Sequence, residues 1–394
     1  MSILVAFRFE SNIGYAIERL ERVFLAVARR LVGGDEHIHF SYPSLDGGAP
    51  NVLEGTQVRV LQFDQFSTDP DAHRRIEQYL LGHRIQIALG MDFQVKRPTY
   101  PALSRGGIKA LAAYWGAPMS AENSGVRLLL KRLDVATTRH KPGLYIFESE
   151  AMRRTATHGR GIPASSTAVC RLSVDSTRFA PREAGWSYPR DLFGIPGDRA
   201  IVFYSGHMEE RKGVAVIVKA MVELVVSRHR RDVHLLVLGN RPGEADRFDP
   251  LFAGTPAQHH VTFGGYRSDV ADIMPGCSIG VIASTGWDSF PASSLEMASS
   301  GLPLIVSNLG GLPETIIPEE TGLLFPPGDH LALADAIERL IDDPEERLAF
   351  GNRARARILS SFTPQQQIDG LVTALEGLCH RTGVPYGGAR AEPD

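Results

Sequence analysis

Two carboxylates bracket a short stretch that is otherwise small and apolar. Asp288 and Glu296 stand with seven residues between them in WDSFPASSLE. The preceding run IGVIAST predicts a buried strand, and PASSLEMASSG predicts a helix that begins near Pro291, because proline suits a first helical position. Amides at a helix start attract phosphate, so both carboxylates could bind hydroxyl groups on either side of the phosphates of one ligand. The simpler alternative is that Asp288 caps the helix and Glu296 is solvated.

A lysine occupies a second strand-to-helix turn, YSGHMEERKGV. We place Lys212 in the first turn of the following helix, where a cation opposes the helix dipole and is useful only if an anion binds there. His207, just past the strand end, would add a second donor. Alternatively, Lys212 forms a weak surface ion pair with Glu209 or Glu210.

A third turn, ESNIGYAIERL, carries Glu10, Asn12 and Gly14 before a helix. A glycine at a helix start allows the backbone to approach an anion closely. The pattern is not GxGxxG, however, so an ordinary turn glycine explains Gly14 equally well.

Strand-like and helix-like segments alternate along the chain twice, which predicts an α/β protein with two parallel, doubly wound sheets. The Pro- and Gly-rich stretch PREAGWSYPRDLFGIPGDR separates the two series. We therefore expect a first domain over 1–183 joined by a C-terminal helix over 364–383, a linker over 184–199, a second domain over 200–363, and a loose tail over 384–394. The carboxyl ends of two such sheets would face a shared ligand cleft.

Composition narrows the function classes. The 394 residues are 43% hydrophobic and 22% charged, with no apolar run long enough to span a bilayer. Three scattered cysteines and an N-terminus that looks like a strand rather than a signal peptide favour the cytoplasm. The 13 histidines contain no HExxH-like pair, so the sequence gives no sign of a catalytic metal. It also contains no basic stripe with interleaved aromatics, so nucleic-acid binding is not predicted. Residues 1–180 carry a net charge of +6 and the remainder −9, which would suit an anionic acceptor or lipid surface, although scattered surface charge is the simpler explanation.

Several motifs in order resemble the GT4-type retaining glycosyltransferases. That family has two acidic residues with seven between them, then a small-residue helix, GLP, an apolar strand and GGLPE. Here Asp288 and Glu296 keep the spacing, with SGLP at 300–303 and GGLPE at 310–314. SGHMEERKG, VDSTRFAP and VHLLVLGN are similar to further family segments, and the likeness extends over about residues 144–362. A match of several motifs in the right order is far more specific than any one.

The resemblance implies a GT-B fold, with two Rossmann-like domains, a nucleotide-sugar donor held mainly by the second, and an acceptor held mainly by the first. It assigns Glu296 to the ribose hydroxyls, Asp288 to hydroxyls of the transferred sugar, and Lys212, with His207, to the diphosphate. No divalent metal or other cofactor is expected. The remaining donor contacts that it implies are Gly14, Asn12, Gly206, Ser289, Phe290, Ala292, Ser293, Gly239, and, near the base, Tyr266 and Arg267.

Three positions depart from the family pattern. Asp288 stands where glutamate is usual, so its carboxylate reaches about one methylene less far toward the sugar. His207 stands where arginine is usual, which weakens diphosphate neutralisation and makes it more dependent on pH. The family also has a histidine near the position of Trp115 and Gly116, and this chain has none there. The residues expected to line the acceptor site instead are Trp115, Ser120, Glu122 and Asn123, although ordinary packing explains Trp115 equally well.

The resemblance implies a retaining, metal-independent transferase of a hexose or aminohexose, and we expect it to act on the hydroxyl of a small soluble acceptor. Such an acceptor would suit polar or acidic groups such as Glu10 and Glu122. A lipid-linked or membrane-surface acceptor is the alternative that the basic first half favours. From another class, a GT-B protein that binds a nucleotide sugar without transferring it would explain the altered residues, and an epimerase or phosphorylase is a weaker option.

Overall fold

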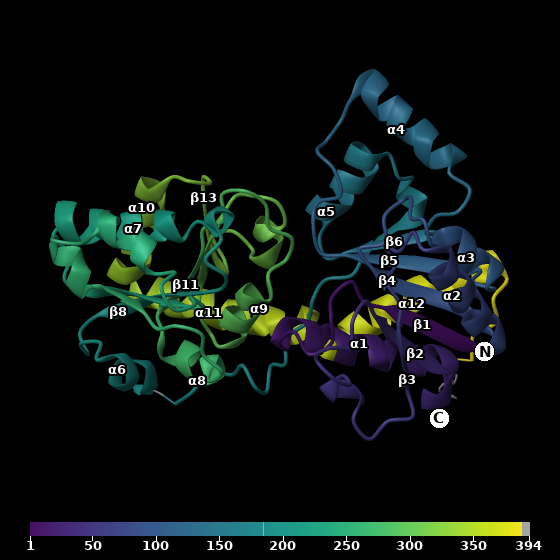
Figure 1. Ribbon diagram of the computed structural model, residues 1–394. Helices are drawn as coiled ribbons and strands as arrows, with labels where there is room; N and C mark the ends of the chain where they lie inside the picture. The colour runs from purple at the N-terminus through teal and green to yellow at the C-terminus, as the bar shows by residue number, and fades with distance from the viewer. Residues whose placement is uncertain (184, 388–394) are drawn as a thin grey trace. The chain divides into compact units, whose positions relative to one another are not determined.

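The computed structural model describes residues 1–183 and 185–387, which form two units by their internal contacts (Figure 1). The first unit contains residues 1–171 together with the described chain from Pro364 onward, and the second contains residues 172–363. Each unit has its own parallel sheet and its own buried core. Within the described ranges, no helix has both the length and the apolar character needed to cross a bilayer.

The first unit is built on seven parallel strands in the order β3-β2-β1-β4-β5-β6-β7. The strands are β1 (Ser2–Ala6), β2 (Ile38–Tyr42), β3 (Arg59–Gln62), β4 (Ile85–Met91), β5 (Ala110–Trp115), β6 (Leu144–Phe147) and β7 (Thr167–Val169). Its helices are α1 (Tyr15–Val32), α2 (Pro70–Gly82), α3 (Tyr100–Arg105), α4 (Gly125–Thr137), α5 (Glu150–Arg154) and α12 (Pro364–Thr382), with shorter turns η1 (Asp35–His37), η2 (Asn51–Leu53), η3 (Thr155–Arg160) and η4 (Ala164–Ser166).

The second unit has six parallel strands in the order β10-β9-β8-β11-β12-β13. The strands are β8 (Ala200–Ser205), β9 (Val233–Leu238), β10 (Val261–Phe263), β11 (Ile279–Ile282), β12 (Leu304–Ser307) and β13 (Gly322–Phe325). Its helices are α6 (Tyr188–Phe193), α7 (Val214–Val222), α8 (Val270–Ile273), α9 (Ala292–Ser299), α10 (His330–Asp342) and α11 (Pro344–Ser361), with shorter turns η5 (Glu210–Lys212), η6 (Glu223–Ser227), η7 (Asp246–Leu251), η8 (Pro256–His259), η9 (Met274–Gly276) and η10 (Leu312–Thr315).

Hydrophobic patterning explains these elements. Every residue of β1 is buried, as expected for a central strand of a parallel sheet with both faces covered. The apolar residues of α1 recur at spacings of three and four, and the stripe is buried from Leu20 to Leu31. The C-terminal helix α12 packs against α1 and β5, which returns the end of the chain to the first unit.

Each sheet has one point where the strand order reverses, and in such sheets ligands bind beyond the carboxyl ends of the strands there. In the first unit that point lies between β1 and β4. In the second it lies between β8 and β11, so the loops over 206–213 and 283–291 leave the sheet side by side. These are the turns that carry Lys212 and Asp288.

Two segments differ from their expected character. The stretch over 184–199 was expected to be a linker, but its described residues belong to the second unit and include α6; Trp186 Nε1 donates to the carbonyl of Asp272 at 2.8 Å. The first part of the expected loose tail is anchored, since Val384 is buried and the Gly387 amide donates to the Leu31 carbonyl at 3.1 Å. Ala184 and residues 388–394 lie outside the described residues.

Candidate functional site

A buried ion pair stands at the switch point of the second sheet. Nζ of Lys212, after β8, donates to Oδ2 of Asp288, after β11, at 2.8 Å. The two side chains are 16% and 6% exposed. A pair so little exposed to water depends on both partners, because removing either leaves a poorly solvated charge.

Hydrogen bonds hold the Asp288 carboxylate in a fixed orientation. Ser284 Oγ donates to Oδ2 at 2.7 Å, and the Ser289 amide donates to Oδ1 at 3.2 Å. Ser284 is itself held through its carbonyl, which accepts from Ser307 Oγ at 2.7 Å. The carbonyl of Asp288 accepts from the Gly311 amide at 3.0 Å. The carboxylate is thus a preorganised acceptor rather than a mobile surface group.

A glycine allows the two loops of the site to meet. Gly213 has φ +70, and a Cβ placed there would lie 1.8 Å from the carbonyl oxygen of Ala283. The close approach brings Lys212 to the β11 loop. The sequence placed Lys212 in the first turn of a helix; it is instead the last residue of the turn η5, and Gly213 is the N-cap of α7.

The surroundings of the ion pair are consistent with a site for an anion. Lys212 pairs with Asp288 and not with Glu209 or Glu210, and Glu209 accepts from Arg211 Nε at 2.7 Å. An ammonium has three N–H donors, and among the described residues Lys212 uses only one. Two of the three N–H donors of Lys212 are therefore left for a ligand. Burial, reinforced by the Asp288 charge, also raises the pKa of the nearby Tyr204.

Arg211 adds a second cation beside the β11 loop. Its guanidinium stacks over the Trp287 ring at 4.0 Å, and Nη1 donates to the Trp287 carbonyl at 3.0 Å. This contact fixes the residue immediately before Asp288. Sequence reasoning missed Arg211, although its place beside Lys212 in EERKG was a signal.

The helix α9 follows the Asp288 loop and carries Glu296. Its N-cap is Pro291, without a side-chain capping bond, so Asp288 does not cap this helix and the capping alternative is excluded. Ala292 is its first residue, one later than the sequence suggested, and Ser293 follows; both are half-buried. Their amides belong to the first turn, where amides lack acceptors within the helix. Glu296, in the second turn, is buried.

Ser289 and Phe290 differ in what they can offer a ligand. Ser289 Oγ is buried and has no hydrogen-bond partner among the described residues, which leaves a hydroxyl for a bound group. The Phe290 ring packs against Phe362, with centroids 5.6 Å apart, so only the backbone of Phe290 is available.

Glycines bring the carboxyl ends of β8 and β9 close together. Gly239 has φ +104, and a Cβ there would lie 2.2 Å from the Gly206 carbonyl oxygen. The amide of Gly206 donates to the Leu238 carbonyl at 3.1 Å, and that of Gly239 donates to the Gly265 carbonyl at 2.8 Å. These residues shape the strand ends, and His207 beside them is exposed.

The two residues assigned to the base have different environments. Tyr266 is largely exposed. Arg267 forms a two-bond ion pair with Asp269, at 2.8 and 2.5 Å, and Asp269 also accepts from Tyr188 of α6 at 2.7 Å. The Arg267 guanidinium lowers the pKa of Asp269 to about 2. Arg267 thus ties its loop to α6, and Tyr266 is the side chain free to move.

In the first unit, Gly14 is the N-cap of α1 with φ +131, a conformation that requires glycine. The Asn12 side chain is used locally, because Nδ2 donates to the carbonyls of Gly47 and Ala49 at 2.8 and 2.9 Å. Asn12 therefore fixes the 47–51 loop beside the α1 start, while Glu10 is exposed.

The residues assigned to the acceptor are mostly engaged in local structure. Trp115 lies in the core, and its Nε1 donates to the Phe93 carbonyl at 3.1 Å, as the packing alternative predicts. Asn123 Nδ2 donates to the Gly159 carbonyl at 2.8 Å and holds its loop to η3. Ser120 donates to a neighbouring carbonyl, and Glu122 is exposed 3.6 Å from Arg154.

Sequence reasoning missed two carboxylates at the carboxyl edge of the first sheet. Asp92 lies directly after β4 and is buried, and its Oδ2 accepts a hydrogen bond from Nη1 of Arg8 at 2.9 Å. Because Arg8 follows β1, this contact stands at the switch point of the sheet. Burial raises the pKa of Asp92, and Arg8 opposes that shift. Glu148, directly after β6, is also buried, and its Oε1 would lie 3.0 Å from a Cβ placed on Gly116. A carboxylate directly after an apolar strand was the signal for both.

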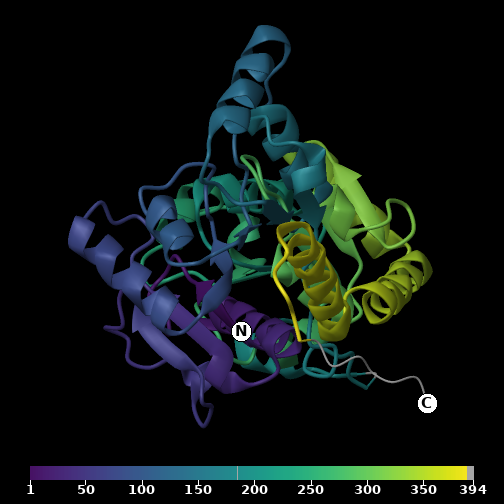
Figure 2. The same ribbon diagram turned by 90° about the vertical axis from the view of Figure 1, so that its right-hand side faces the viewer.

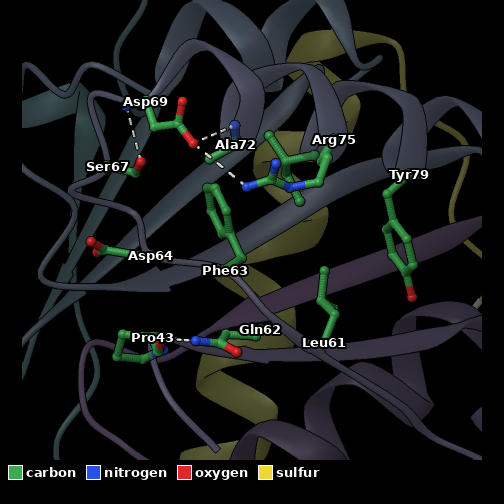
Figure 3. A pocket seen from close by; sticks show the side chains of 11 residues that line it. Pro43, Leu61, Gln62, Phe63, Asp64, Ser67, Asp69, Ala72, Arg75 and Tyr79 are labelled. Atoms are coloured by element: carbon green, nitrogen blue, oxygen red, sulfur yellow. Dashed lines mark hydrogen bonds and ion pairs between the residues drawn. The ribbon is translucent and has the colours of Figure 1, made fainter.

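Two cavities lie in the first unit. One, of about 580 Å³, opens between β3 and α2 and is lined by aromatic, acidic and basic side chains, among them Phe63, Asp69 and Tyr79 (Figure 3). The other, of about 170 Å³, is lined in part by Trp115 and Arg160. Apart from Trp115, none of the residues assigned to the acceptor lines either cavity. No group of three or more His, Cys, Asp or Glu in the described ranges is arranged to hold a metal ion.

Residues 190–357 match the family described as Glycosyl transferases group 1. Among curated relatives, α-D-kanosaminyltransferase of Streptomyces kanamyceticus is 31% identical over 45% of this chain and 46% of its own length. D-inositol 3-phosphate glycosyltransferase of Corynebacterium diphtheriae is 27% identical over 47% of this chain and 45% of its own length. This chain thus spans about half the length of the curated relatives that it matches.

Solved structures match almost the whole chain. The Anabaena protein HepE in complex with UDP has a TM-score of 0.76 at 18% identity, covering 96% of this chain and 100% of its own. Sucrose-phosphate synthase of Thermosynechococcus elongatus has a TM-score of 0.73 at 20% identity, and the match covers 97% of this chain and 100% of the synthase. At these identities the likeness shows the fold, which is GT-B, with a Rossmann-like parallel sheet in each unit. The expected fold class and the resemblance to GT4-type glycosyltransferases are confirmed, and these relatives and HepE are bacterial.

Proposed function

Because residues 190–357 match the group 1 glycosyltransferase family, we propose that this protein transfers a hexose or aminohexose from a nucleotide sugar to an acceptor hydroxyl. The observation that carries the proposal is the buried Lys212–Asp288 pair at the switch point of the second sheet, directly before α9. A nucleoside diphosphate would meet two N–H donors of Lys212 and the first amides of α9 there.

The reaction would depend on stabilising the leaving group. The bond between the sugar C1 and the diphosphate oxygen breaks, the acceptor oxygen bonds to C1, and the acceptor proton goes to an oxygen of the departing diphosphate. Negative charge grows on the diphosphate as the bond breaks, and fixed donors lower the barrier because they need no reorganisation. Lys212 and the amides of Ala292 and Ser293 supply these donors, and an imidazole N–H of His207 would add another.

Two carboxylates would position the donor. Asp288, held by Ser284 and the Ser289 amide, would accept hydroxyl groups of the transferred sugar, and Glu296 would accept the ribose hydroxyls. Both would bind rather than attack, so we infer retention by attack on the face that the diphosphate leaves. The Lys212 ammonium would take the part that a divalent ion plays in other transferases, so no metal is required.

Neighbouring proteins support the choice of donor. HepE was solved with UDP and with UDP-glucose, and one curated relative is named for transfer of the aminosugar kanosamine. The acceptor was expected to be small and soluble, with a lipid-linked acceptor as the alternative; both remain proposals. A binding protein without transfer is disfavoured by the preorganised Asp288 and the two remaining donors of Lys212, which suit catalysis.

A transfer assay tests this proposal. Purified protein is incubated with α-linked nucleotide sugars and a panel of hydroxyl acceptors, with EDTA present or absent, and the product linkage is read by NMR. We expect an α-linked product at the same rate with and without EDTA. A β-linked product would contradict retention, a requirement for added metal would contradict the role of Lys212, and donor binding without any product would favour the binding-protein alternative.

A further inference from the structure

The helix α4 carries an apolar stripe that its own unit leaves exposed. Val126, Leu129, Leu130 and Leu133 are between 52% and 72% exposed. They lie at spacings of three and four residues, so they form one continuous face of the helix. Single exposed leucines are ordinary, but four on one helix face mark a contact surface.

The opposite side of the helix already serves the fold. Val135 of α4 is buried, and η3 packs against the helix. Gly161 lies so close that a Cβ there would be 2.7 Å from the Arg132 amide nitrogen. In two views, α4 stands away from the sheet of its own unit (Figures 1 and 2). The apolar stripe therefore faces outward, roughly opposite Val135.

Cations flank the stripe on both sides. At 100° per residue, Arg127 borders one side of it and Arg132 the other, and Lys131 lies beyond Arg127, toward Val135. All three are exposed and have no acidic partner among the described residues. Asp134, the acid of this helix, is already neutralised by Lys96 and Arg160.

We propose that α4 docks on an anionic lipid surface, with its axis in the plane of the surface and the apolar stripe inserted among the lipids. An outward apolar face with Lys and Arg at its borders is the pattern of helices that lie in a membrane interface. Its 13 residues are too few to span a bilayer, which excludes a transmembrane role.

Charge argues against a second copy of this chain as the occupant. A two-fold contact brings the same patch of both copies together, so Arg127 and Arg132 of one copy would lie close to the same cations of the other. Anionic headgroups would instead neutralise these cations while the acyl chains bury the leucines. Docking goes beyond the proposed transfer reaction and can be measured without any donor or acceptor.

Co-sedimentation with vesicles tests the docking. Full-length protein is mixed with phosphatidylcholine vesicles with and without phosphatidylglycerol, as wild type, as Leu129→Glu/Leu133→Glu, and as Arg127→Gln/Arg132→Gln. We expect wild type to bind the phosphatidylglycerol vesicles. The leucine variant should bind at least about 30-fold more weakly. The cation variant should lose roughly 25-fold, or about fivefold for each charge, and salt should weaken binding.

The matched control is Leu348→Glu/Leu359→Glu on α11, which changes two exposed leucines in the second unit and should bind vesicles like wild type. An independent measurement uses the variant Leu130→Cys labelled with a polarity-sensitive dye. The fluorescence emission of the dye should shift to the blue when the protein binds phosphatidylglycerol vesicles. Absence of wild-type binding, equal loss in the control, or an unshifted dye would overturn the proposal. A wild-type dimer that Leu129→Glu/Leu133→Glu dissociates would identify a second copy as the occupant and overturn it as well.

Discussion

Replacing Lys212 with methionine is expected to lower transfer activity about 1000-fold and the melting temperature by roughly 10 °C. The activity loss follows from removing the cation that would meet the leaving diphosphate. The stability loss follows because Asp288, only 6% exposed, would lose its ion-pair partner. Breaking such a buried pair typically lowers the free energy of unfolding by about 3–5 kcal/mol. In a unit of this size, each kcal/mol lowers the melting temperature by roughly 2–4 °C.

The double variant Lys212→Met/Asp288→Asn separates the two effects. Asparagine can accept from the Ser289 amide through Oδ1 and donate to Ser284 Oγ through Nδ2, and it carries no charge to be compensated. We therefore expect most of the lost melting temperature to return while transfer stays low. Lys212→Arg, which keeps the charge, serves as the control for charge alone.

The measurements are thermal melting of each variant and initial transfer rates below the melting transition. If the double variant recovered activity together with stability, Lys212 would be a structural residue and its proposed contact with the diphosphate would be wrong. If Lys212→Met melted like wild type, the pair would not be the buried, interdependent contact described here.

A single methyl group at Gly213 is expected to destabilise the second unit by about 3 kcal/mol. Alanine at φ +70 costs roughly 1–2 kcal/mol, and its Cβ would lie 1.8 Å from the Ala283 carbonyl oxygen, which forces the two site loops apart. Below its melting temperature, Gly213→Ala should also bind nucleotide more weakly, because the displaced loop carries Lys212.

Gly194→Ala is the matched control for this prediction. Gly194 has φ +65 in the same unit, and a Cβ there meets no atom within 4 Å. Alanine at Gly194 imposes the backbone strain without the collision, so it should cost only about 1–2 kcal/mol and leave nucleotide binding unchanged. Equal melting temperatures for the two variants would show that the approach of Gly213 to Ala283 is not needed.

Much of the fold could be predicted because the signals are local. The continuous burial of β1 and the apolar stripe of α1 are written in consecutive residues, and the alternation of such segments specifies parallel sheets. The extent of the second unit was harder to predict. The stretch over 184–199 reads as a linker by its prolines and glycines, but contacts such as Tyr188 with Asp269 join residues 81 positions apart.

The site was predictable to the extent that its motifs are short. The spacing of Asp288 and Glu296, and Lys212 before a glycine, indicated an anion site from consecutive residues. The Lys212–Asp288 bond spans 76 positions and was not predicted, and neither was the engagement of Arg267 by Asp269. The apolar residues of α4 predicted a helix, but only its packing shows which face stays exposed.

The measurement that tests the central claim most directly is a thermal-shift screen of wild type and Glu296→Ala against UDP, GDP, ADP, dTDP and their common sugars. A nucleotide at about 100 times its dissociation constant should stabilise the folded protein by roughly 2.7 kcal/mol. We predict that one nucleotide raises the wild-type melting temperature and that Glu296→Ala shows no such rise above its own melting temperature in buffer. If no nucleotide shifts wild type, or if Glu296→Ala responds equally, the corner at Asp288 and Glu296 is not the donor site.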